Sequence, residues 1–164
     1  MNEDKKTLKR MLEGDLPWEQ LKPIIGDHKD PNRFDMIIEI LQEKLKWEDQ
    51  IILPLHEHLF IVSKDGERIV KCDCGYEFGN YKINWKTKCK VRVRDTFEQI
   101  EELYPKDMGS DPNWEELREY YCPGCFSLLD VEAVPPGYPV IFNFLPDIDT
   151  FYEKWLGRNP PDKK

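Results

Sequence analysis

The chain has 164 residues, of which 34% are charged and 40% hydrophobic, and its net charge is −8. This length suits one domain with extensions, and scattered lysines and arginines under a net negative charge argue against a nucleic-acid partner. No apolar run approaches the roughly 20 residues of a membrane span, and the start, MNEDKKTLKR, lacks the apolar stretch of a signal peptide. We therefore expect a cytoplasmic protein without membrane association.

The first part of the chain predicts three helices. A short one ends at Gly14, which suits a left-handed cap, and a second begins at Pro17 and closes at Gly26. The third is predicted over about residues 31–45, because Asp30 can cap its free amides. Its apolar stripe, which we expect to pack on the chain's own core, comprises Phe34, Ile37, Ile38, Leu41 and Leu45.

The hydrophobic period then changes to that of strands. HLFIVSK (58–64) and ERIVKC (67–72) are rich in branched and aromatic residues, and Asp65-Gly66 between them is a two-residue hairpin signal. CKVRVRD (89–95) alternates valine with arginine, which predicts a further, half-exposed strand.

Helices are predicted next, at about residues 96–104 and, after Asp111-Pro112, at about 113–119. SLLDVEAV (127–134) reads as a strand.

The C-terminal segment from Pro135, PPGYPVIFNFLPDIDTFYEKWLG, combines prolines with crowded apolar residues. One reading is an extended arm that wraps a large partner, anchored by a short helix begun near Asp147 or Asp149 and carrying Phe151 and Trp155. The other reading is that the segment folds back on the chain's own core.

Two cysteine pairs stand out in the sequences KCDCGYEF and YYCPGCFS. Tetrahedral zinc takes four thiolates, and short-spaced pairs in glycine-containing turns place two ligands at a time. The first pair is separated by a single residue, which is tighter than the usual two to four. In the reducing cytoplasm metal binding is favoured over disulfides, so we predict a structural zinc site made of Cys72, Cys74, Cys122 and Cys125.

Other interpretations of these cysteines stay open. The same four sulfurs could hold iron as in rubredoxin, or they could be buried thiols without a metal. Cys-Pro-Gly-Cys alone resembles a thiol redox motif, although that motif requires a following helix. Cys89 is interpreted as a small core residue. His56 and His58 have a spacing that can ligate metal but are predicted to be a solvated strand start. Asp73 and Glu77 are treated as exposed acids that could also support or replace a metal ligand.

These elements predict an α+β fold: a small antiparallel sheet with a zinc-ribbon-like four-cysteine site, N-terminal helices and an extended C-terminal arm ending in a short helix. We expect an N-terminal helical segment over residues 1–50, a zinc-binding β-rich core with inserted helices over 51–134, and the arm and helix over 135–164. No phosphate-binding glycine loop, nucleophile elbow or compact acid pair is found, so a self-contained active site is not expected.

Several stretches resemble the gamma subunit of acetone carboxylase, namely KDPNRF, EILQEKLKWEDQIILPLHEHLFIV, VKCDCGYEF, NWK, VRVRDT, REYYCPGC, DVEAVPPGYPVI and DIDTFYEKWLG. The resemblance implies a noncatalytic, zinc-containing small subunit in a heterohexamer with two copies each of alpha, beta and gamma chains. Such complexes convert acetone, bicarbonate and ATP to acetoacetate, AMP and two phosphates.

In that family the large subunits hold the manganese and ATP sites, and the zinc would map onto the four paired cysteines. A related acetophenone-type ketone carboxylase, a free-standing zinc-ribbon adaptor and a rubredoxin-like electron carrier are the alternatives.

Overall fold

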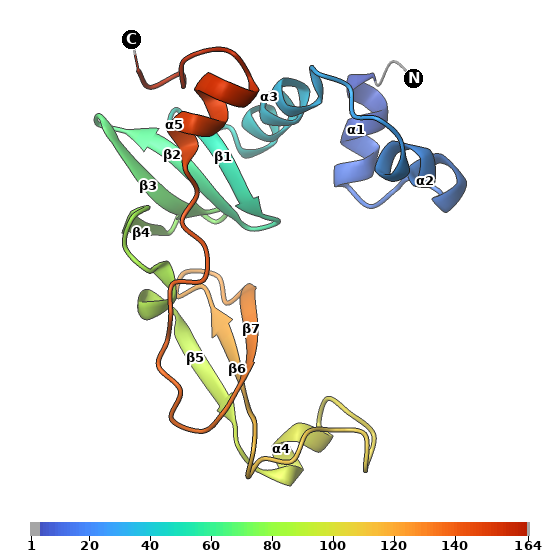
Figure 1. Ribbon diagram of the computed structural model, residues 1–164, viewed down its shortest axis with the longest axis vertical. Helices are drawn as coiled ribbons and strands as arrows, with labels where there is room; N and C mark the ends of the chain where they lie inside the picture. Colours follow the sequence, from blue (N-terminus) through green and yellow to red (C-terminus); the bar gives the residue numbers. More distant parts are fainter. Residues whose placement is uncertain (1–3, 164) are drawn as a thin grey trace.

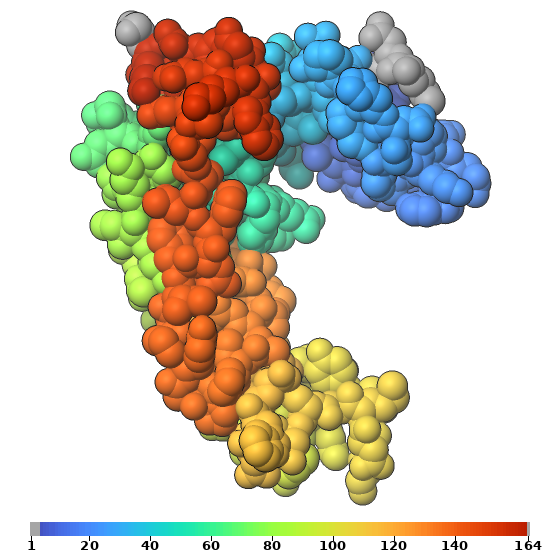
Figure 2. All heavy atoms as spheres, viewed as in Figure 1, coloured from blue at the N-terminus to red at the C-terminus, as the bar shows by residue number. Residues whose placement is uncertain are grey.

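The structure is a computed structural model that describes residues 4–163, and it has an elongated, hooked shape (Figures 1 and 2). Two antiparallel sheets lie end to end along its length, with the N-terminal helices beside the upper sheet in this view. The N-terminal helices and the lower end of the molecule project to the same side, so that side of the molecule is hollowed (Figure 2). In the described residues no helix has the length and apolar character to cross a membrane.

Three helices precede the first sheet: α1 (Lys5–Leu12), α2 (Trp18–Gly26) and α3 (Arg33–Leu45). Asp4 caps α1 by accepting a hydrogen bond from the Thr7 amide, and Leu8 is fully buried. α3 contacts both α1 and the first strand. Four residues of its apolar stripe, Ile37, Ile38, Leu41 and Leu45, belong to a cluster with the buried Phe60 and Val62, and Phe34 packs against Phe151 and Tyr152 of the C-terminal segment. The stripe therefore serves the chain's own core, as expected.

The upper sheet is a meander of β1 (Gln50–His56), β2 (Leu59–Lys64), β3 (Glu67–Cys72) and β4 (Glu77–Asn80). Asp65 and Gly66 both adopt positive φ, 51° and 82°, in the β2–β3 hairpin, which confirms the hairpin signal. Neither β1 nor β4 was predicted from the sequence. β1 carries Pro54 and two register shifts against β2, so its residues do not alternate regularly between buried and exposed.

The lower sheet contains β5 (Lys90–Arg94), β6 (Glu116–Tyr121) and β7 (Leu128–Val134) in that order, and a 3₁₀ turn, η1 (Trp85–Lys88), precedes it. The predicted helix at 96–104 is present only as α4 (Phe97–Glu101).

The helix predicted at 113–119 is wrong, because most of that segment belongs to β6, the central strand. The Asp111 carbonyl does accept bonds from Trp114 and Glu115, so a helical turn starts there. Pairing with strands on both sides then overrides the local helix preference, and it places Glu119 beside the buried Arg94 with 2.9 Å between oxygen and nitrogen.

One apolar cluster crosses from the upper sheet to the lower one. It contains Ile52, Leu59, Ile61, Val70 and Phe78 from the upper sheet, and Cys122 and Leu129 from the lower. Ile148 and Tyr152 of the C-terminal segment complete this cluster, and the Tyr152 hydroxyl donates to the Ile52 carbonyl at 2.8 Å.

The C-terminal segment leaves β7, returns along the lower sheet as an extended arm, and ends on the upper sheet (Figure 1). It finishes in a short helix made of α5 (Ile148–Thr150) and one π-helical turn, η2 (Phe151–Trp155), capped by Asp147. The extended arm and the terminal helix agree with the sequence analysis. The helix packs on the chain's own core, whereas much of the arm is exposed.

Candidate metal centre

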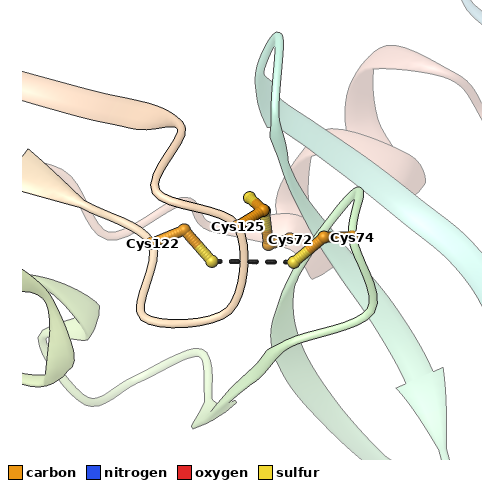
Figure 3. Close-up of side chains that lie close together, drawn as sticks. All are labelled: Cys72, Cys74, Cys122 and Cys125. Carbon is orange, nitrogen blue, oxygen red and sulfur yellow. Dashed lines mark hydrogen bonds between the residues drawn. The ribbon is translucent and has the colours of Figure 1, made fainter.

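The two cysteine pairs lie in two turns that face each other where the sheets meet (Figure 3). Cys72 is the last residue of β3 and Cys74 lies in the turn before β4; Cys122 and Cys125 lie in the turn from β6 to β7. All four sulfur atoms are within 4.8 Å of one another. The structure thus brings together the four residues that the sequence analysis selected.

The sulfur separations fit a tetrahedral metal. Sγ of Cys72 is 3.8 Å from Sγ of Cys125, and Sγ of Cys74 is 3.7 Å from Sγ of Cys122. Four thiolates bound at about 2.3 Å in a tetrahedron would be about 3.8 Å apart. A disulfide would require about 2.05 Å, and all five cysteines are free.

Backbone hydrogen bonds shape each turn. In the first turn the Cys72 amide donates to the Tyr76 carbonyl at 2.8 Å, and Gly75 has a φ of 95° that favours glycine. In the second turn the Cys122 amide donates to the Ser127 carbonyl at 3.0 Å. These bonds define the backbone of the two turns that carry the cysteine pairs.

Gly124 allows the two turns to approach each other. A Cβ atom at this position would lie 3.1 Å from Cys74 Sγ and equally close to Tyr76 Cβ. Its amide points at Cys122 Sγ at 3.4 Å, where it can donate to a thiolate.

The four thiols differ in their environments. Burial raises the pKa of the Cys72 and Cys74 thiols, whereas the hydrogen bond between Cys125 and the Ser127 hydroxyl lowers the pKa of Cys125 to about 7. A bound metal favours the thiolate form of each ligand, so it would offset the burial cost at Cys72 and Cys74. The four sulfurs can hold one tetrahedral ion such as zinc or iron.

The environment of Cys122 does not fit a thiol redox motif. Cys122 begins a tight turn, and β7 rather than a helix follows Cys125. The helix amino terminus that lowers the pKa of the first cysteine in such motifs is therefore not present at this site.

The remaining candidate residues, one cysteine, two histidines and two acids, are not part of the four-cysteine cluster. Cys89 is half-buried against the apolar cluster that joins the two sheets, and burial raises the pKa of its thiol to about 12. His56 is the last residue of β1, so the expectation of a strand start is wrong for it, whereas His58 lies in the β1–β2 turn directly before β2 and is partly exposed. Both rings are partly buried and hydrogen-bonded, and Asp73 bonds His58 instead of facing solvent alone. Glu77 pairs with Lys64 at 2.5 Å.

Sequence reasoning also missed a buried polar cluster close to the metal centre. Lys86 is 3% exposed, and its Nζ atom lies 2.6 Å from carboxylate oxygens of both Asp130 and Glu132. The Tyr120 hydroxyl donates to the second Glu132 oxygen at 2.6 Å. No spacing signal marks these residues, because they meet only when η1, β6 and β7 pack together.

Comparison with known proteins identifies the family. The family model described as acetone carboxylase gamma subunit matches residues 45–156. The acetone carboxylase gamma subunit of Xanthobacter autotrophicus (strain Py2) is 45% identical over 155 residues, which are 93% of this chain and 92% of that protein. The acetophenone carboxylase beta subunit of Aromatoleum aromaticum is 34% identical over 82 residues, 48% of this chain and 62% of that protein. The chain belongs to the acetone carboxylase gamma subunit family.

Proposed function

We propose that this chain is the noncatalytic gamma subunit of an ATP-dependent acetone carboxylase. The observation that carries the proposal is the match to an acetone carboxylase gamma subunit over nearly the full length of both chains. The match to an acetophenone carboxylase subunit covers only about half of this chain, so acetone is favoured as the ketone.

The proposed reaction joins acetone and bicarbonate to give acetoacetate while ATP is converted to AMP and two phosphates. Alpha and beta subunits would bind manganese and ATP and perform this chemistry, in a heterohexamer with two copies of each chain. The gamma chain would support the assembly, working in the cytoplasm.

We propose that Cys72, Cys74, Cys122 and Cys125 hold one zinc ion per chain, and that the ion has a structural role. The sulfur spacing supports a tetrahedral metal, and a closed set of four thiolates leaves no position open for substrate. Because each cysteine pair comes from a different sheet, the metal would tie the two sheets together. Iron in the same site is the alternative that metal analysis would reveal.

We further propose a functional division of the chain at residues 50 and 134. The helical segment 1–50 and the arm with its helix, 135–164, would flank a metal-binding core over 51–134. Residues 133–146 contain no charged side chain, although 34% of the chain is charged. The exposed large apolar side chains of this stretch are Tyr138, Val140, Ile141, Phe144 and Leu145. Depletion of charge with exposed apolar and aromatic groups is typical of the core of an interface, so we propose that the arm contacts a large subunit.

Activity of defined assemblies tests the proposal. Alpha and beta chains of the same organism are purified with and without this chain, and acetone-dependent AMP formation is measured together with acetoacetate. We expect no turnover from this chain alone and full turnover only from the three-chain assembly. Full turnover by alpha and beta chains without it would contradict the supporting role, and ATP hydrolysis by the isolated chain would contradict the noncatalytic role.

A further inference from the structure

The two halves of the metal centre belong to separate sheets, so something must hold their turns at the correct distance. β3 and β4 carry the first cysteine turn, and β6 and β7 carry the second. A tetrahedral site tolerates little error in ligand position, and a site that is arranged before the metal enters binds it more tightly.

The β1–β2 turn contacts the first cysteine turn through His58. Its Nδ1 atom is 2.6 Å from Oδ2 of Asp73, which lies between Cys72 and Cys74. In addition, the Asp73 amide donates to the His58 carbonyl at 3.0 Å. Two bonds thus attach this turn to the residue between the two ligands.

The end of β1, next to this turn, contacts the second half of the site through His56. The His58 amide donates to Nδ1 of His56 at 3.2 Å, so Nδ1 is an acceptor and the ring proton lies on Nε2. That Nε2–H group donates to the Leu129 carbonyl at 2.5 Å. Leu129 is a buried residue of β7, the strand that follows Cys125.

The two histidines therefore form one bridge between the halves of the metal centre. It runs from Asp73 through His58 and His56 to Leu129, and none of its bonds requires a metal. We propose that His56 and His58 are positioning residues that hold the two cysteine turns in place for metal capture and retention. This inference rests on the proposed metal site, and it assigns these histidines a role other than ligation.

Cobalt provides a direct test, because tetrahedral Co²⁺–thiolate sites have visible absorption bands that report ligand geometry. The full-length chain is loaded with Co²⁺, its spectrum is recorded, and release of the ion to excess chelator is followed. His56→Phe and His58→Phe remove the bridge while keeping an aromatic ring. We expect altered bands and release about 10- to 100-fold faster than in the unchanged chain, the range typical of outer-shell residues.

Three control variants separate positioning from a general loss of stability. His28→Phe changes the third histidine of the chain, which is exposed in a loop, and should release cobalt at the original rate. Leu41→Ala weakens the other apolar cluster and should lower stability without changing the bands. His56→Gln keeps an amide donor for the Leu129 carbonyl and should restore most of the slow release.

The outcomes distinguish this inference from the proposed function. If the unchanged chain binds cobalt tightly but both phenylalanine variants keep its spectrum and release rate, the bridge is refuted and the metal site stands. Changes of equal size in Leu41→Ala would also refute a specific positioning role. If the unchanged chain fails to bind cobalt with a thiolate spectrum, both proposals are overturned.

Discussion

The contribution of single cysteines to metal binding can be tested by substitution, and the one cysteine outside the cluster serves as a control. We expect Cys122→Ser and Cys125→Ser each to lower the zinc content of the purified chain and its free energy of unfolding. A structural zinc ion can contribute about 10 to 16 kcal/mol in small peptides, so loss of one ligand should be a large effect. Elemental analysis of the desalted protein measures the metal content.

Cys89→Ser is the matched control, because Cys89 is partly buried but is not among the clustered sulfurs. It should keep one zinc per chain. Unchanged zinc in both Cys122→Ser and Cys125→Ser would rule out the four-cysteine assignment.

The buried Lys86 predicts a second strong single-residue effect. Burial would raise the pKa of Glu132, but the bonds from Lys86 and Tyr120 outweigh it and lower that pKa below its ordinary value. Lys86→Ala would leave the carboxylates of Asp130 and Glu132 without their cation, so we expect a loss of about 3 to 5 kcal/mol in denaturant unfolding. The exposed Lys88 lies in the same 3₁₀ turn, and Lys88→Ala should change stability by less than about 0.5 kcal/mol. Equal effects of the two substitutions would contradict the role given to the buried cluster.

At the residue scale the sequence predicts the cysteine cluster better than the residues that surround it. Cys72, Cys74, Cys122 and Cys125 were identifiable because short spacing between cysteines is a local property of the chain. The hydrogen bond from His56 to Leu129 joins residues that are 73 apart in the sequence, and no local pattern can indicate a partner at that separation.

At the scale of elements, regular hydrophobic periods made most helices and strands predictable, and β6 shows where that method fails. Its sequence, ELREYY, has residues that suit a helix, and a helical turn at Asp111 precedes it. This segment forms a strand because it pairs with β5 on one side and β7 on the other. β5 ends 22 residues before β6 begins, whereas β7 follows β6 after a single tight turn. Tertiary pairing therefore decides a segment whose local preference points elsewhere.

Two aromatic residues of the C-terminal helix differ in their exposure, so they can be used to test stability and the proposed assembly separately. Tyr152 is 1% exposed in the apolar cluster that joins the two sheets, whereas Trp155 is 78% exposed in the same helical turn. We expect Tyr152→Ala to cost about 3 to 5 kcal/mol in unfolding free energy, as for other buried aromatic residues. Trp155→Ala should leave the stability of the isolated chain unchanged.

Denaturant unfolding of both variants measures the first effect, and co-purification with large subunits measures the second. If Trp155 lies at the proposed interface, its loss should weaken co-purification while the fold is kept. A Tyr152→Ala chain as stable as the original would show that the helix does not belong to the core.

At the scale of the whole molecule, the structure joins two sheets and a returning arm around one apolar cluster. The sequence predicted the α+β class, the N-terminal helices, the cysteine cluster and the extended arm with its helix. It did not predict that the strands form two separate sheets, because sheet membership is set by pairing between distant segments. The cysteine cluster and the hydrogen bonds of His56 and His58 both lie where these sheets meet.

The measurement that tests the central proposal most directly is native mass spectrometry of the complex purified from cells through a tag on this chain. We expect an assembly containing two copies each of this chain and of two larger chains, with a mass that includes one zinc ion per copy of this chain. Recovery of this chain alone, or of the full assembly with no zinc bound to this chain, would contradict its role as a zinc-stabilised subunit of an acetone carboxylase.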